Sequence, residues 1–454
     1  MKNIIKNIKL FKKIRRGLIN FFTAGHLIFS LKTELKSGKP EKGISFLRKK
    51  YPIIKPRSVL FLIELYSYLV TLKNSFVWEG DNKKKLIIHF CCWGDNYAEK
   101  ARDYLLPSLL AKNNLPAIFK EYTINLFVHC DTKTKADLES LVVLAEIKKY
   151  AAVNIIALPD RLVNHYQSLT RYPDFSLLKD INRSNRGLRY LLLGALQANA
   201  LKDGIQHQAL VSFLMPDSIL SDSFYFYALS KIEGKKLILT TTFRTNYKAV
   251  RKHLAKFYVD DSKAVCSVSG AELSKLQVEY LHDTEQRRVI SEETTHFLAC
   301  ARFIFKSKEG LLLRALHYHP ILVDCGKIAN DLKIDYFPID DSILKRVLEE
   351  DNTPYEEQVW ICSDPAMMNF MELSDPNPEV NEPPIFLVPS TYASLLNSIY
   401  LLIRSCPMEL NEKMNRFFIQ NELKFSAGEG YNDETAVIDS EKFLLDLYAR
   451  IDSE

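Results

Sequence analysis

Continuous apolar runs alternate with helix-like stretches through the middle of the chain. The runs are short and carry few polar residues, which is typical of strands buried on both faces of a sheet, and apolar residues recur three and four positions apart between them. This alternation predicts a three-layer α/β domain with a mostly parallel sheet. The predicted strands are residues 85–92, 124–130, 152–158, 209–214 and 236–241, and the predicted helices are residues 97–110, 134–150, 184–201 and 223–232.

The first 33 residues have a different pattern, in which apolar positions follow helical spacing and lysine or arginine fills many of the gaps. This predicts a basic amphipathic helix. Its apolar runs are too short to span a bilayer, which needs about 20 apolar residues. We expect residues 1–22 either to lie on an anionic membrane surface or to pack on the body as an ordinary solvated helix. No small-residue cleavage site follows, so a cleaved secretory signal is disfavoured.

The ends of the predicted domain are marked by weaker signals. Residues 34–83 have the pattern of a helical connector, and Pro-rich spacers interrupt the chain after about residue 345. We therefore expect an α/β domain at residues 84–345, with an acidic α/β lobe appended at residues 346–454. Within that lobe the pattern predicts strands at 358–362 and 385–388 and a helix at 391–403.

Charge is distributed unevenly along the 454 residues. Eight of the 61 Lys and Arg residues and no acidic residue lie in residues 1–33, which leaves 53 basic and 55 acidic groups in the rest of the chain. Residues 351–454 hold 19 acidic and 6 basic residues. A nearly neutral body gives no electrostatic basis for nucleic-acid binding, and we expect no nucleic-acid partner.

Glycine and cysteine usage exclude several common sites. The chain contains no G-x-G-x-x-G and no G-x-x-x-x-G-K-[ST], which disfavours the Rossmann fingerprint, the P-loop and a methyltransferase. Its eight cysteines include no C-x-x-C pair and have mostly apolar neighbours. This favours reduced, buried thiols in a cytoplasmic protein over disulfides or a zinc knuckle.

The loop after the first predicted strand is a candidate binding site, because ligands of parallel sheets gather at the carboxyl ends of the strands. Trp93 and Tyr97 offer rings to cover a base or sugar, Gly94 permits close approach of the backbone, and Asp95 can bond a ribose or a base edge. The alternative is an ordinary turn with a helix cap at Asp95 or Asn96.

The end of the fourth predicted strand offers carboxylates. Asp217 follows Pro216 directly after the strand, and Asp222 follows five residues later. A carboxylate at this edge can hold a divalent cation that bridges a diphosphate. The alternative is that Asp217 or Ser221 caps the helix predicted at 223–232.

Two further groups of residues have chemistry that fits a phosphate-bearing substrate. Arg183, Arg186 and Arg189 lie where a helix is predicted to begin, and both arginine forks and helix N-termini bind phosphate oxygens. Glu292 and Glu293 are candidates for a general base. The alternatives are a solvated helix face for the arginines and the first turn of a capped helix for the glutamates.

The chain resembles a group of bacterial glycosyltransferases of the GT-A type over roughly residues 84–330. The resemblance rests on the order of an aromatic-Gly loop after the first strand, the segments 105–110 and 113–117, the second strand, a helix with an Asp203-Gly204 turn, and a strand ending in Pro216-Asp217. It implies a three-layer GT-A-like (Rossmann-like) domain that binds a nucleotide-sugar donor near the first strand.

The resemblance also implies a divalent metal, Mn or Mg, held by an acid at the D-x-D position, which Asp217 occupies here. The literal motif is absent, because the next acid is Asp222. A late histidine often joins the metal in such enzymes, which indicates His317 or His319, and packing in the core is the alternative for this pair.

The function that we expect is transfer of a sugar from a nucleotide-diphosphate donor to a polysaccharide, lipid-linked or protein acceptor. The expected location is the cytoplasm, with attachment to the inner face of the membrane through residues 1–22. The alternative is a non-catalytic nucleotide- or glycan-binding module on the same scaffold.

Overall fold

The computed structural model describes residues 83–164, 179–290, 296–298, 302–329 except 308, 344–376 except 351, 412–426 and 440–452, and parts of 64–78 and 387–400. Within these ranges, only the backbone is described for residues 179–191, 296–298 and 387–389. The basic helix predicted at 1–33 and most of the connector at 34–83 lie outside these residues. Among the residues described, no helix is long and apolar enough to cross a membrane.

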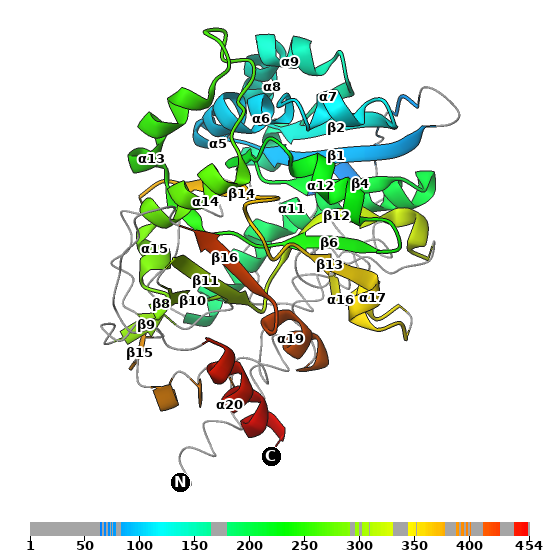
Figure 1. The fold of residues 1–454 in the computed structure, drawn as a ribbon. Helices are drawn as coiled ribbons and strands as arrows, with labels where there is room; N and C mark the ends of the chain where they lie inside the picture. Colours follow the sequence, from blue (N-terminus) through cyan, green and yellow to red (C-terminus); the bar gives the residue numbers. More distant parts are fainter. Residues whose placement is uncertain are drawn as a thin grey trace.

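A seven-stranded sheet forms the centre of the described structure (Figure 1). Six of its strands run in the same direction, and β12 is antiparallel to both of its neighbours. The strand order is β13 (Val359–Ile361), β6 (Leu237–Thr240), β12 (His319–Asp324), β4 (Leu210–Leu214), β1 (Lys84–Cys92), β2 (Tyr122–Cys130) and β3 (Ala152–Ala157). The predicted α/β class and the mostly parallel sheet are confirmed.

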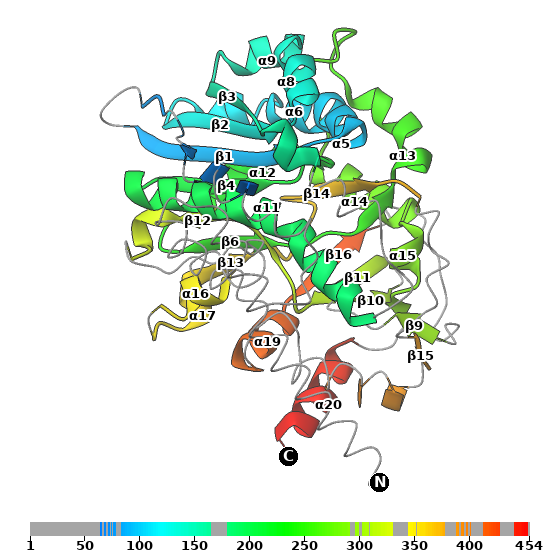
Figure 2. The ribbon, with the colours of Figure 1, turned by 180° about the vertical axis from the view of Figure 1, so that it is seen from behind.

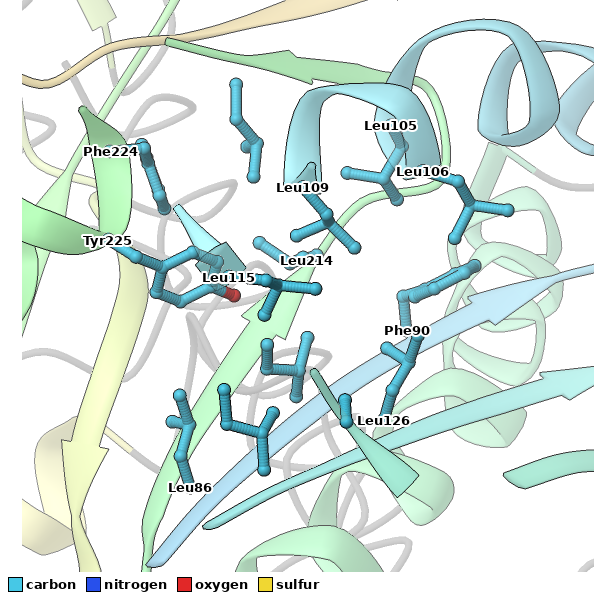
Figure 3. Close-up of a cluster of buried hydrophobic side chains, with 14 of the residues drawn as sticks. Leu86, Phe90, Leu105, Leu106, Leu109, Leu115, Leu126, Leu214, Phe224 and Tyr225 are labelled. Atoms are coloured by element: carbon cyan, nitrogen blue, oxygen red, sulfur yellow. The ribbon is translucent and has the colours of Figure 1, made fainter. Parts of the chain in front are cut away.

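Helices cover both faces of this sheet, because its strands are apolar on both sides. On β1, Leu86, Ile88 and Phe90 pack into one core, and Ile87 packs into another on the opposite face. Figure 3 shows the first core, where side chains of β1, β2 and β4 meet the surrounding helices. Those helices are α5 (Asp95–Lys100), the π-helix η1 (Ala101–Leu105), α6 (Leu106–Leu109), α7 (Leu115–Ile118), α8 (Thr132–Glu139), α9 (Val142–Ile147) and α12 (Phe224–Lys231).

The opposite face is covered by the long helix α11 (Lys179–His207) and by a second sheet (Figure 2). Also in this core lie α16 (Leu344–Leu348) and α19 (Glu412–Ile419). The second sheet has the order β16 (Glu422–Ser426), β11 (Gly310–Ala315), β10 (Arg302–Lys306) and β8 (Val289–Ile290). α20 (Ser440–Asp452) packs against this sheet in a smaller core with Phe303 and Phe305.

Two small sheets complete the strand pairing. The first has the order β5 (Ser218–Leu220), β14 (Phe370–Ser374) and β7 (Arg244–Asn246), and the second pairs β15 (Leu387–Pro389) with β9 (His296–Leu298). The remaining helical elements are α13 (Tyr247–Leu254), η2 (Ala255–Phe257), α14 (Gly270–Glu279), α15 (Asp283–Gln286), η3 (Cys325–Lys327) and α17 (Tyr355–Gln358).

The pairing of β13, β14 and β16 changes the predicted domain organisation. β13 extends the large sheet, β14 is the middle strand of the small sheet, and β16 pairs with β11. All three were expected in an appended lobe beginning at residue 346. They instead complete sheets begun by earlier residues, so no boundary separates them from the main body.

Asp203 and Gly204 do not form the turn that the sequence suggested. Both lie inside α11, which continues to His207. A Cβ at Gly204 would lie 2.3 Å from Val211 Cγ2 and 2.7 Å from Cys325 Sγ. The glycine is therefore required by the close approach of α11 to β4 and η3, and not by a turn. The helix predicted at 134–150 is likewise interrupted, with α8 ending at Glu139 and α9 beginning at Val142.

Candidate functional site at the carboxyl edge of the large sheet

The strand order places a topological switch between β1 and β4. The chain runs outward from β1 through β2 to β3, and then crosses to the other side of β1 to form β4. In sheets of this kind a crevice opens at the carboxyl ends of the two strands that flank the switch, and ligands bind there. β1 ends at Cys92 and β4 ends at Leu214, so we expect a ligand site in the segments that follow these residues.

Asp217 lies at this switch point. It occupies the turn between β4 and β5, and its carbonyl oxygen accepts a hydrogen bond of 2.7 Å from the Leu373 N–H on β14. Its carboxylate lies close enough to Cys92 to contribute to the raised pKa of that thiol, after burial and the charges of Cys130 and Asp131. Asp217 is thus held between the ends of β1 and β4 and the small sheet.

The carboxyl group of Asp217 is hard to ionise. Burial and then the nearby Glu372 raise its pKa to about 7, while Lys100 and Arg244 partly offset this rise. Glu372 comes from β14 and accepts a hydrogen bond of 2.9 Å from Arg244 Nε on β7. The carboxylates of Asp217, from the turn after β4, and Glu372, from β14, therefore lie near each other, and a cation bound there would favour the ionised form of both.

Lys100 supplies a buried positive charge beside these acids. Only 1% of the residue is exposed, and Nζ donates a hydrogen bond of 2.7 Å to Asp375 Oδ2. Nζ also lies 5.0 Å from the centre of the Tyr247 ring, within range of a cation–π interaction. Although burial opposes it, hydrogen bonds from Lys100 and Asn96 hold the pKa of Asp375 below its ordinary value.

The loop after β1 is positioned by its backbone. Gly94 has φ of +85°, which favours glycine, and its N–H donates a hydrogen bond of 2.9 Å to Asp131 Oδ2 at the end of β2. Asp131 also caps α8 through Thr134, and these hydrogen bonds hold its pKa below the ordinary value although burial opposes them. The loops that follow β1 and β2 are therefore linked.

The predicted side chains of this loop have different environments. Asp95 is exposed and pairs with Lys133 at 2.6 Å, and it borders a surface hollow of about 260 Å³ between α5 and α8. The Tyr97 ring is 44% exposed and faces Lys100. Neither Asp95 nor Asn96 caps α5, which has no side-chain cap. Both rings of the predicted loop, Trp93 and Tyr97, remain candidates for covering a ligand.

The capping alternative for Asp217 and Ser221 does not hold. The residue before α12 is Ser223, and it makes no side-chain cap. Buried Asn114 supplies the cap from a distant loop, because its Oδ1 accepts a hydrogen bond of 2.9 Å from the Tyr225 N–H. Ser221 Oγ instead accepts a hydrogen bond from the Asn369 N–H. Asp222 hydrogen bonds through its N–H to the Val268 carbonyl, and burial raises the pKa of its side chain.

His319 lies at the same edge of the sheet as Asp217, because β12 runs in the reverse direction. It is the first residue of β12, it pairs with Thr240, and its Nε2 lies 3.1 Å from the Phe213 carbonyl oxygen. Among the residues described, Asp217, Asp222, His317 and His319 do not form a set of three donor atoms close enough to share one ion. A metal at these residues stays a prediction.

The other predicted residues cannot be placed in the site. Arg183, Arg186 and Arg189 belong to α11, but their side chains lie outside the described part of the structure. Glu292 and Glu293 lie outside the described residues altogether.

Several residues of the site were not found from the sequence. Asp131 follows a strand directly, so the rule that selected Asp217 would have selected it too. No such signal marks the other four residues, Lys100, Arg244, Glu372 and Asp375. The two acids among them lie in the segment that the sequence predicts to be a separate lobe.

Comparison of the chain with protein-family models finds no match, and comparison with curated protein sequences finds none either.

Proposed function

We propose that this chain is a glycosyltransferase of GT-A type, which moves a sugar from a nucleotide-diphosphate donor to a polysaccharide, lipid-linked or protein acceptor. The observation that carries the proposal is the placement of Asp217 at the switch point between β1 and β4, beside Glu372. Two further features support it: the sheet is mostly parallel with one reversed strand, and Asp217 is the third residue after β4.

The charges at this edge suit a diphosphate together with a divalent cation. Three carboxylates, those of Asp217, Glu372 and Asp375, lie with two cations, those of Lys100 and Arg244. The excess acid and the raised pKa of Asp217 fit a hard cation such as Mg²⁺ or Mn²⁺, which prefers oxygen ligands. When bound, such a cation would neutralise charge on the donor's phosphates and on the departing nucleotide.

The protein's own groups would orient the donor. Asp217 and Glu372 would hold the cation, and Lys100 and Arg244 lie near enough to these acids to interact with phosphate oxygens. Trp93 and Tyr97 on the loop after β1 offer rings for the base or sugar. Gly94, fixed by Asp131, allows the backbone of this loop to approach the ligand.

The second candidate is a non-catalytic nucleotide- or glycan-binding module. It is favoured by one observation, that among the described His, Cys, Asp and Glu residues no group of three that includes Asp217 lies close enough to share one ion. A module of this kind would bind the nucleotide through the same edge without turnover.

Incubation of the full chain with UDP- and GDP-sugars, with Mn²⁺, Mg²⁺ or EDTA, tests the proposal. We expect metal-dependent release of nucleotide from one donor class, loss of at least about 100-fold in rate for Asp217→Asn, and a smaller loss for the control Asp222→Asn. Binding of nucleotide without hydrolysis or transfer would favour the module, and neither binding nor turnover would refute both.

A further inference from the structure

A second polar group is buried in the large sheet, on the face away from Leu86 and Phe90. His89 and Cys91 are two residues apart on β1 and therefore point to the same side, and His129 on β2 is the register partner of Cys91. The exposed fractions are 1% for His89, 6% for Cys91 and 0% for His129. The group thus lies beneath the loops of the candidate site, facing the core that contains α11.

The three donor atoms are already close together. His89 Nε2 lies 3.1 Å from His129 Nδ1 and 4.0 Å from Cys91 Sγ, and all three donors lie within 4.8 Å of one another. Tetrahedral zinc, with bonds of about 2.0–2.1 Å to nitrogen and about 2.3 Å to sulfur, separates its ligands by roughly 3.3–3.6 Å. A movement of the sulfur by about 1 Å, with a small separation of the two rings, would complete this geometry.

The hydrogen bonds within the group leave buried donors or acceptors without partners. The two imidazoles share one N–H between them, and His129 Nε2 has no hydrogen-bond partner. The hydroxyl of Tyr68, whose pKa is raised by burial and then by Cys91, also has none. Buried polar atoms without partners destabilise a fold, so the arrangement is unfavourable unless something else binds there.

The protonation states suit metal ligation by the rings. Burial lowers the pKa of His129 to about 4, and burial followed by the charge of His129 lowers the pKa of His89 well below its ordinary value. Both rings are therefore neutral, as ligation requires. Burial raises the pKa of the Cys91 thiol, so an ion must displace its proton to solvent on binding.

We propose that His89, Cys91 and His129 bind one zinc ion, which joins β1 to β2. Two imidazoles and one thiolate form a set that prefers zinc to Mg²⁺ or Mn²⁺, so this site is distinct from the carboxylate site at Asp217. Three protein ligands leave one position on a tetrahedral ion, and the Tyr68 hydroxyl, which has no hydrogen-bond partner, lies close enough to Cys91 to interact with it electrostatically.

The position of the ion gives it a structural role. Cys91 is three residues before Gly94, and His129 is two residues before Asp131. Because Gly94 and Asp131 are hydrogen-bonded to each other, an ion beneath them would fix the separation of the two loops that flank the candidate site. Loss of zinc would loosen these loops and lower the stability of the sheet.

The zinc content of the full chain tests this inference. The protein is purified under reducing conditions, incubated with zinc chloride and desalted, and its metal is measured by mass spectrometry. We expect about one zinc per chain for the unaltered protein and less than about one tenth for Cys91→Ser and for His129→Gln. Cys92→Ser is the matched control, since Cys92 is the next residue but faces the opposite core, and it should keep its zinc.

Cobalt loading of the unaltered chain gives a readout that needs no variant to fold. We expect a thiolate-to-cobalt absorption band that zinc displaces and that survives Cys92→Ser. Asp217→Asn should keep both metal signals, which separates this inference from the proposed activity. A chain that retains neither zinc nor cobalt, or a Cys91→Ser variant that keeps the band, would overturn the inference.

Discussion

The titration of Asp217 sets a testable dependence of stability on pH. The pKa of this carboxyl is raised in the folded chain from 3.8 to about 7, chiefly by burial and then by Glu372. Between these pH values the folded chain keeps a proton that the unfolded chain has released. The free energy of unfolding therefore decreases as the pH rises through this window.

Replacing Asp217 by Asn should remove this decrease. Asn resembles the protonated acid, so we expect similar stability at pH 4 and a stability higher by about 1–3 kcal/mol in the variant at pH 8. Urea unfolding at the two pH values measures the difference. Equal pH dependence in both proteins would show that Asp217 ionises normally.

Burial decides which ion pairs near the site matter for stability. Lys100 pairs with Asp375 at 2.7 Å with 2% of its side chain exposed, and Lys133 pairs with Asp95 at 2.6 Å with 66% exposed. We expect Lys100→Met to lower the free energy of unfolding by about 1–3 kcal/mol and Lys133→Met to leave it almost unchanged, because solvent screens the exposed pair. Chemical denaturation of the two variants compares them directly, and equal effects would contradict the buried environment of Lys100.

At the scale of single elements, strands and their order along the chain were predictable and distant pairing was not. The strands now seen as β1, β2, β4 and β6 are continuous apolar runs, because each is buried on both faces. The edge strand β3 is only partly buried, but its apolar residues pack against both cores. β14 is only five residues long and its partners β5 and β7 lie more than 100 residues before it. No local pattern indicates such partners, and this is why Glu372 was not recognised beside Asp217.

Gly204 illustrates the same limit for helices. Its sequence context with Asp203 suggested a turn, whereas the structure shows contact between α11 and the side chains of Val211 and Cys325. We expect Gly204→Ala to lower the free energy of unfolding by about 1–3 kcal/mol through overpacking, with less effect in combination with Val211→Ala than the two single changes together. Lys202→Ala, on the exposed side of α11, is the control. Thermal and urea unfolding measure these effects. A Gly204→Ala variant as stable as the unaltered chain would show that α11 can shift away from Val211 and Cys325.

At the scale of the whole molecule, the basic charge is concentrated at one end. Residues 1–33 contain eight basic residues and no acidic residue, and apolar positions recur among them. We propose that residues 1–22 bind anionic membrane surfaces, and we expect their deletion to leave a folded chain that no longer sediments with phosphatidylserine vesicles. Sedimentation of the intact chain should weaken at high salt. Equal sedimentation with and without these residues would remove the membrane proposal.

The C-terminal quarter, unlike residues 1–22, should be required for a folded chain. Ending the chain at residue 345 removes β13 from the edge of the large sheet, β14 from the middle of the small sheet and β16 from β11. Apolar faces of three sheets would then be exposed, together with the unpaired edges of β6, β5, β7 and β11. Exposed strand edges of this kind recruit other chains, so we expect residues 1–345 to aggregate or to be degraded rapidly by protease. A soluble, protease-resistant product of this length would show instead that residues 346–454 form a separate lobe. The chain without residues 1–22 provides the comparison, since it loses none of the described strands and should keep the proteolytic pattern of the full-length protein.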